Sequence, residues 1–132
     1  MSVLKVVIAD DIFTNRLLLS EIIEDLGHEY ITVENGKEAI EAVLNNDIDI
    51  VLMDIEMPVM NGIEATKYIR EELDKPKCYT TVVALTAHNP KIFFDDFKDV
   101  GFSQLLTKPY SVKKITELLN SFTSKVNSAY KE

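Results

Sequence analysis

The sequence predicts an α/β fold, a doubly wound sheet of five parallel strands in the order 2-1-3-4-5 with helices on both faces. Two observations predict it. Strand-like and helix-like segments alternate five times along the 132 residues. Several strand-like segments are continuous apolar runs, which suits strands that are buried on both faces of a parallel sheet. The predicted strands lie near residues 3–9, 29–33, 48–54, 80–85 and 103–107.

The strands and the first helix can be placed by their patterns. The first strand, 3–9, and the third, 48–54, are apolar almost throughout and are expected at the centre of the sheet. The second, 29–33, alternates more between polar and apolar residues, which indicates an edge strand. The helix between the first two strands is expected to end at Gly27, because glycine readily takes the left-handed conformation that closes a helix.

Three later helices carry start signals. Asn35, with Glu38 three residues on, matches an N-cap with a capping-box partner. Asn89–Pro90 places a cap before a proline at the first helical position, and Gly101 can end that helix. Ser111 can cap the last helix. That helix carries apolar residues at helical spacing: Val112, Ile115, Leu118, Leu119 and Phe122.

Composition indicates a single globular domain. Hydrophobic residues make up 46% and charged residues 27% of the chain, which is ordinary globular usage, and we expect one domain over 1–127 with a polar tail over 128–132. The net charge of −8, with scattered basic residues, argues against direct nucleic-acid binding. No run approaches the roughly 20 apolar residues of a membrane helix. A single cysteine, Cys78, favours a reducing, cytoplasmic location.

Four predicted strands stop at polar residues of particular kinds. The runs end at Asp10 and Asp11, at Asp54, at Thr86 and at Lys108. Ligand sites in open α/β sheets form outside the carboxyl ends of the strands, so these five side chains are expected to converge on one edge. Carboxylates, a hydroxyl and an ammonium group together indicate a site for a divalent metal and a phosphoryl group.

The three carboxylates need a compensating cation. Unit charges about 4 Å apart repel by roughly 4 kcal/mol at an effective dielectric of 20. Mg²⁺ resolves this repulsion, because it prefers oxygen ligands and leaves coordination positions for water and phosphate oxygens. The alternative interpretation is that Asp10, Asp11 and Asp54 simply begin loops or cap helices. The metal, Thr86 and Lys108 would neutralise the charge of a transferring phosphoryl group. Asp54 is then left as the nucleophile, because a carboxylate can form an acyl phosphate.

At these residues the chain resembles a known family. The motifs are the pair Asp10–Asp11, the segment VLMDIEMPVMNG around Asp54, ALTAH around Thr86, and Lys108–Pro109. In this order they resemble the receiver domain of two-component response regulators, with its CheY-like, flavodoxin-like fold, over residues 3 to about 125. The sequences of the motifs are most similar to those in receivers of hybrid histidine kinases.

The resemblance implies a role for each site residue. It makes Asp54 the phosphoacceptor, with Mg²⁺ as cofactor, and Thr86 and Lys108 the groups that bind the phosphoryl oxygens. It implies the following metal ligands: Asp10, Asp11, Asp54 and the backbone carbonyl of Glu56. It also implies a cis peptide at Lys108–Pro109. A separate hypothesis is that Glu56 and His88 tune the access of water to the acyl phosphate; in the alternative, both are merely exposed.

Leu105 departs from the family pattern. Receivers usually carry a Tyr or Phe at this position, three residues before the lysine, and its ring changes rotamer as the threonine moves. Either the switch here runs through Thr86 and loop movement alone, or the domain is mainly a phosphoryl relay. Phe102 and Tyr110, close by, are interpreted as core or surface residues rather than as substitutes.

The resulting prediction is a signalling module. A histidine kinase or a histidine phosphotransfer protein would donate a phosphoryl group to Asp54, and a downstream protein would read the change on the face of the fourth helix, fifth strand and fifth helix. Ile92 and Phe94 are candidate exposed anchors there, unless that helix is simply buried more broadly. The chain would not be an enzyme, although it takes part in its own phosphorylation and dephosphorylation. The alternative is a Mg²⁺-dependent phosphatase with a phospho-aspartate intermediate, in which Glu56 would act as general acid.

Overall fold

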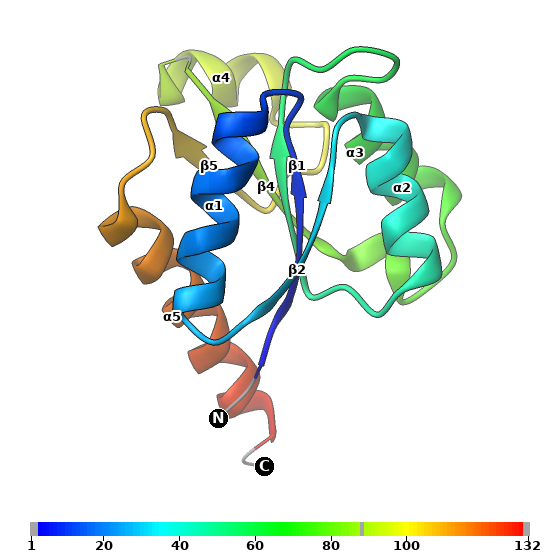
Figure 1. Ribbon diagram of the computed structural model, residues 1–132. Helices are drawn as coiled ribbons and strands as arrows, with labels where there is room; N and C mark the ends of the chain where they lie inside the picture. Colours follow the sequence, from blue (N-terminus) through cyan, green and yellow to red (C-terminus); the bar gives the residue numbers. More distant parts are fainter. Residues whose placement is uncertain (1–2, 88, 131–132) are drawn as a thin grey trace.

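Five parallel strands form one sheet in the order β2-β1-β3-β4-β5, which confirms the predicted order (Figure 1). The computed structural model describes residues 3–87 and 89–130. The strands are β1 Lys5–Ala9, β2 Glu29–Val33, β3 Ile50–Asp54, β4 Thr81–Thr86 and β5 Gln104–Thr107. The helices are α1 Phe13–Asp25, α2 Gly36–Asn45, α3 Gly62–Glu72, α4 Pro90–Phe97 and α5 Val112–Tyr130, with a short 3₁₀ helix at Lys77–Tyr79.

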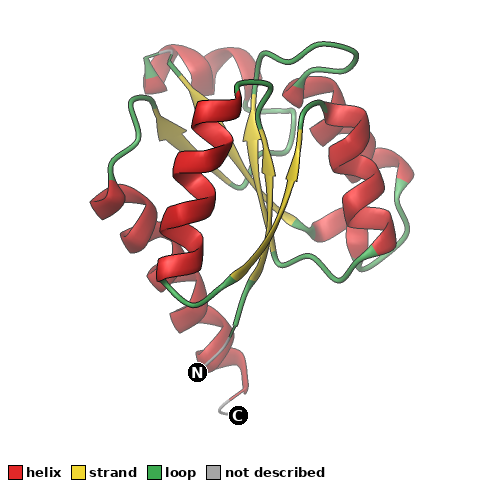
Figure 2. Ribbon diagram, viewed as in Figure 1, coloured by secondary structure: helices red, strands yellow, loops and turns green. Residues whose placement is uncertain are grey.

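Helices cover both faces of the sheet (Figure 2). Ile8 and Leu52 belong to the core layer that α1 and α5 cover, whereas their neighbours Val7 and Met53 belong to the layer under α2 and α3. Phe93 of α4 closes a smaller cluster on the latter face. Burying one large apolar side chain stabilises the fold by about 2 kcal/mol, and the central strands bury theirs on both sides as the apolar runs predicted.

The predicted cap of α2 is confirmed, with one difference. The Asn35 side chain accepts a hydrogen bond from the Glu38 N–H, at 2.9 Å. The Glu38 carboxylate, however, accepts from the N–H of Glu34, one residue before the cap. A reciprocal capping box occurs instead at α3, between Asn61 and Glu64. The sequence analysis missed that signal, although Asn61 and Glu64 have the same spacing as Asn35 and Glu38.

The start signals of α4 and α5 are confirmed. The Asn89 side chain accepts from the N–H of Lys91, and Pro90 begins α4. The Ser111 hydroxyl accepts from the N–H of Lys114 at the start of α5. α5 continues to Tyr130, so the helix extends into the segment 128–132, which was predicted to be a polar tail.

Two glycines and an arginine hold the loops that lead into the sheet. Gly27 and Gly101 have φ of +84° and +108°, so both adopt the left-handed conformation. Gly27 follows the end of α1 as predicted, whereas α4 ends at Phe97, so Gly101 does not close that helix. The Arg70 guanidinium donates to the carbonyls of Gly101, Cys78 and Thr80, at 2.9, 3.0 and 2.8 Å. Arg70 therefore ties α3 to the chain before β4 and β5, a role that its position in the sequence does not reveal.

Gly62 lets the start of α3 approach β3. Its N–H donates to the carbonyl of Ile55 at 2.9 Å. A Cβ at this position would overlap the main-chain carbonyl oxygen of Asp54 and lie 2.9 Å from the Cγ of Met53. Glycine is therefore required by close backbone contact, and the contact fixes the strand end that carries Asp54.

We expect Gly62→Ala to lower the free energy of unfolding by about 3 kcal/mol, because the added methyl group forces α3 away from β3. The control is Gly27→Asn, since asparagine tolerates positive φ and nothing lies within 4 Å of a Cβ there. We expect that control to change stability by less than about 1 kcal/mol. Urea unfolding followed by circular dichroism measures both, and equal losses would contradict the packing argument.

Candidate functional site

The carboxyl ends of β1, β3, β4 and β5 meet at one edge of the sheet, as the strand order requires. A cleft of about 690 Å³ lies there. The predicted site residues that line it are Asp11, Asp54, Glu56, Thr86 and Lys108. Asp10 lies beside them, fully buried. The structure therefore brings the whole predicted set together.

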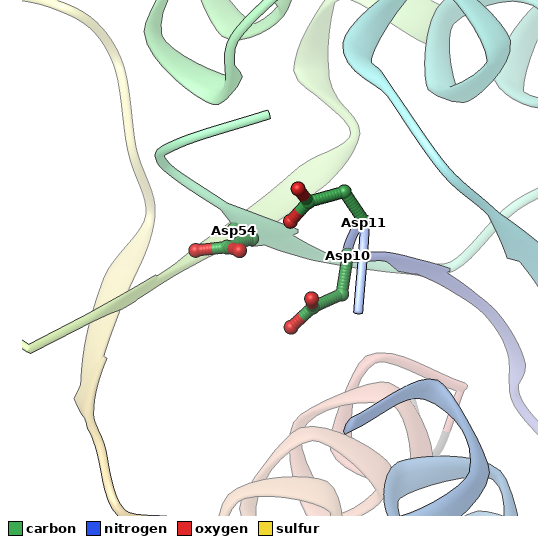
Figure 3. Close-up of side chains that lie close together, drawn as sticks. All are labelled: Asp10, Asp11 and Asp54. Atoms are coloured by element: carbon green, nitrogen blue, oxygen red, sulfur yellow. The ribbon is translucent and has the colours of Figure 1, made fainter. Parts of the chain in front are cut away.

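The carboxylates of Asp10, Asp11 and Asp54 are clustered (Figure 3). Each offers an oxygen atom, and these atoms all lie within 4.8 Å of one another. Asp10 and Asp54 are buried, while Asp11 is exposed. Three oxygen donors at this separation match the ligand type that Mg²⁺ prefers, and the open side of the cleft leaves room for water and a phosphoryl group.

Asp10 is held by α1. Its Oδ1 accepts a hydrogen bond from the N–H of Ile12, and its Oδ2 accepts from the side-chain amide of Asn15 at 3.2 Å. The Arg16 guanidinium donates to the Asp10 main-chain carbonyl at 2.8 Å. The sequence analysis missed Asn15 and Arg16, which a search for polar residues in the helical turn after the acidic pair would have found.

Asp54 is paired with Lys108. The Lys108 Nζ donates to the Asp54 Oδ1 at 3.1 Å. Burial is the main influence on the carboxyl group and raises the pKa of Asp54 above its ordinary value, the hydrogen bond from Lys108 opposes that rise, and the Asp10 carboxylate reinforces it. The ionised form of Asp54 therefore destabilises the folded site unless a further positive charge binds next to it.

Thr86 and Lys108 are linked through the main chain. The N–H of Lys108 donates to the carbonyl of Thr86 at 2.8 Å, which extends the pairing of β4 with β5 beyond the strand ends. Thr86 is buried, and Lys108–Pro109 is cis, as the resemblance implied. A second cis bond, Lys75–Pro76, was not foreseen.

The loop after β3 forms one rim of the cleft. The N–H of Met60 donates to the carbonyl of Pro58 at 2.7 Å, and Val59 between them has φ of +68°. This is a tight γ-turn, and positive φ in a β-branched residue is strained by about 1–3 kcal/mol. The N–H of Gly36 donates to the Met60 carbonyl and helps to hold the turn. Val59 itself is 79% exposed at the rim.

Leu105 lies in an apolar cluster beside α4. It pairs across the sheet with Ala84 and packs with Phe93, Phe97 and Phe102. The ring centroids of Phe93 and Phe102 are 5.6 Å apart. Phe102 is thus a partly buried residue that packs against the core.

Tyr110 also belongs to the core. It packs against the layer under α1 and α5, and among the described residues its buried hydroxyl has no hydrogen-bond partner. The Lys108 Nζ lies 5.9 Å from the centre of its ring. Burial, and then the charges of Asp10 and Asp54, raise the pKa of Tyr110 above its ordinary value.

Two further predictions, one for Glu56 and His88 and one for Ile92 and Phe94, concern exposed positions. Glu56 is exposed and lines the cleft. Ile92 is 59% exposed while Phe93 is buried, so α4 turns Ile92 outward. His88 and the side chain of Phe94 lie outside the described residues.

Over residues 3–87 and 89–130, none of the helices has the length and apolar character that crossing a membrane requires.

A family model for the response regulator receiver domain matches residues 6–120. The chain belongs to this family. This receiver domain therefore functions in two-component and phosphorelay signalling. The match includes residues of all five strands and the motifs at Asp54, Thr86 and Lys108.

Relatives of this receiver domain differ in length. It is 36% identical over 120 residues to the sensor protein GacS of Pseudomonas syringae pv. syringae, a match that covers 90% of this chain and 13% of GacS. The chain thus spans about an eighth of that relative. It is 32% identical to the polar-differentiation response regulator DivK of Brucella anthropi, and that match covers 89% of this chain and 94% of DivK.

A solved structure supports the fold. The receiver domain of the Saccharomyces cerevisiae response regulator Ssk1, crystallised with the histidine phosphotransfer protein Ypd1, superposes with a TM-score of 0.81 at 25% identity. The match covers 91% of this receiver domain and 88% of that chain.

We expect Asp54→Asn to raise the stability of this receiver domain at pH 7 in metal-free buffer. Because the folded-state pKa of Asp54 is raised, its ionised form destabilises the folded state at pH values above that pKa, and the neutral amide removes this cost. The gain should shrink as the pH falls through the raised pKa and disappear below the ordinary value of 3.8, where the carboxyl group is protonated in both states.

Urea unfolding with a chelator present, at a series of pH values, measures this difference. Asp95→Asn, which removes an exposed carboxylate of α4, is the control and should change the free energy of unfolding at pH 7 by less than about 0.5 kcal/mol. A gain for Asp54→Asn that grew towards low pH would contradict the sign of the argument.

Proposed function

We propose that Asp54 is the phosphoacceptor of this receiver domain and that Thr86 and Lys108 bind the phosphoryl oxygens. The observation that carries the proposal is the position of Asp54, which lies in the carboxylate cluster and accepts a hydrogen bond from Lys108 at 3.1 Å. A buried carboxylate with a cation on one side and space in front of it is suited to nucleophilic attack on phosphorus.

Mg²⁺ fits the donor set of the site. Asp10, Asp11, Asp54 and the backbone carbonyl of Glu56 would hold it, since all four offer oxygen ligands at the cleft. When bound, the ion supplies positive charge that offsets the carboxylates and the phosphoryl oxygens. Burial, and to a smaller extent the Asp10 carboxylate, raise the pKa of Asp54, and a bound cation would favour its ionised form.

In the transfer step, an Asp54 carboxylate oxygen forms a bond to phosphorus while the bond from phosphorus to a donor imidazole nitrogen breaks. The imidazole takes up a proton and leaves neutral. Lys108 can then turn from the carboxylate to a phosphoryl oxygen, and Thr86 can donate its hydroxyl to another. Phosphoryl transfer depends mostly on such positioning and charge stabilisation, so few protein groups are needed.

The donor we propose is a histidine kinase or a histidine phosphotransfer protein. Support comes from the Ssk1 receiver domain, which was crystallised with the phosphotransfer protein Ypd1. For a downstream protein we propose the face of α4, β5 and α5, where Ile92 is 59% and Val112 62% exposed. The single cysteine, Cys78, is buried and unpaired, which supports a reducing, cytoplasmic compartment.

The first experiment is incubation with acetyl phosphate and Mg²⁺, followed by intact mass measurement. We expect one added phosphoryl group in the wild type and none in Asp54→Asn or without Mg²⁺. Labelling of Asp54→Asn at the wild-type level would contradict the assignment. Steady release of phosphate from small phosphate esters would instead favour the phosphatase alternative, in which Glu56 acts as general acid.

The second experiment tests Lys108. We expect Lys108→Met to slow labelling by about 100-fold, because a preorganised donor to the phosphoryl oxygens is lost. The pKa of Asp54 should also rise, since Lys108 lowers it, so the pH dependence of labelling should move to higher pH. Lys113→Met, an exposed lysine of α5, is the matched control. Equal rates for the two variants would remove Lys108 from the proposed mechanism.

A further inference from the structure

We propose that Asn15 is a positioning residue that fixes the carboxylate of Asp10 for a divalent cation. The proposal rests on the metal site described above and adds to it a residue outside the ligand set. Asn15 lies in the first turn of α1, five residues after Asp10.

Every polar group of Asp10 has a defined hydrogen-bond partner. The N–H donates to the carbonyl of Val33 at 3.2 Å, and the carbonyl accepts from Arg16 at 2.8 Å. The two carboxylate oxygens accept from the N–H of Ile12 at 2.9 Å and from the Asn15 amide at 3.2 Å. Among the described residues, Asn15 makes the side-chain contact to this carboxylate. The main-chain N–H of Ile12 holds the other oxygen, and the two bonds together fix the rotation of the group.

These bonds leave capacity for a metal. A carboxylate offers about four lone-pair positions, and each oxygen of Asp10 uses one of them for its hydrogen bond. The group is buried, so water does not take up the remainder freely. The free lone pairs belong to oxygen atoms that lie within 4.8 Å of those of Asp11 and Asp54. Asn15 thus orients a ligand without occupying its whole coordinating capacity.

The three carboxylates differ in how they are held. Asp54 is oriented by Lys108, and Asp11 is exposed at the mouth of the cleft. Asp10 has a neutral partner, which orients it without neutralising the charge that attracts a cation. Hydrogen bonds of this kind behind a metal ligand typically change metal affinity 10–100-fold.

The test measures Mn²⁺ binding directly, by the loss of the free-ion signal in electron paramagnetic resonance, in the absence of any phosphoryl donor. Mn²⁺ takes the same oxygen ligands as Mg²⁺. Asn15→Leu keeps the side-chain size and removes the donor, and Asn15→Ser keeps a polar group that is too short to reach. We expect both to weaken Mn²⁺ binding about 10-fold. Thr14→Leu, at the exposed neighbouring position, is the matched control and should bind within about twofold of the wild type.

Circular dichroism and thermal melting of each metal-free variant show that the variants are folded when compared. If the folded Asn15→Leu and Asn15→Ser variants bind Mn²⁺ as tightly as the wild type, the positioning role is overturned. Tighter binding by these variants would also overturn it, because Asn15 would then compete with the cation. Failure of the wild type to bind Mn²⁺, or binding that survives Asp54→Asn and Asp10→Asn, would overturn the metal site itself, and with it the role of Asn15.

Discussion

Repulsion among Asp10, Asp11 and Asp54 is the constraint on which the rest of this receiver domain depends. Three carboxylates within 4.8 Å would destabilise an ordinary fold, and burial makes the ionised form of Asp54 costlier still. Lys108 offsets part of this repulsion by supplying one positive charge at Asp54. The negative charge that Lys108 leaves uncompensated favours the binding of a cation in the cleft. The repulsion that destabilises the carboxylate cluster is therefore also the reason that the cluster attracts a cation.

The backbone around the cluster is correspondingly constrained. Gly62 allows α3 to touch the Asp54 carbonyl, and Val59 is held at positive φ in a γ-turn on the rim. Strained conformations persist only where the surroundings determine them fully, and here the N–H groups of Gly36 and Gly62 donate into the same loop. By contrast, the strands beneath carry ordinary apolar side chains in regular parallel pairing. Over residues 3–87 and 89–130, Val59 is the non-glycine residue with positive φ, and it lies next to the candidate site.

The fold and the convergence of the candidate site residues on one sheet edge could be predicted from sequence because each depends on local patterns. Strands end where apolar runs end, and the order of a doubly wound sheet brings Asp10, Asp54 and Lys108 together. The supporting contacts could not be predicted so easily. Arg70 and Gly101 are 31 residues apart, so only the folded chain relates them. Asn15 is close to Asp10 in sequence, yet its contact depends on how the chain turns from β1 into α1.

Leu105 shows how the chemistry of the site and its readout can be separated. An aliphatic side chain has no hydroxyl to pair and no ring to reorient, so it cannot report the state of Thr86 through a hydrogen bond. It does pack against Phe93 and pair with Ala84, two residues before Thr86. Close-packed side chains transmit small displacements of a strand to the helix above it. In the described part of this domain, Leu105 therefore meets α4 through apolar packing with the phenylalanine cluster.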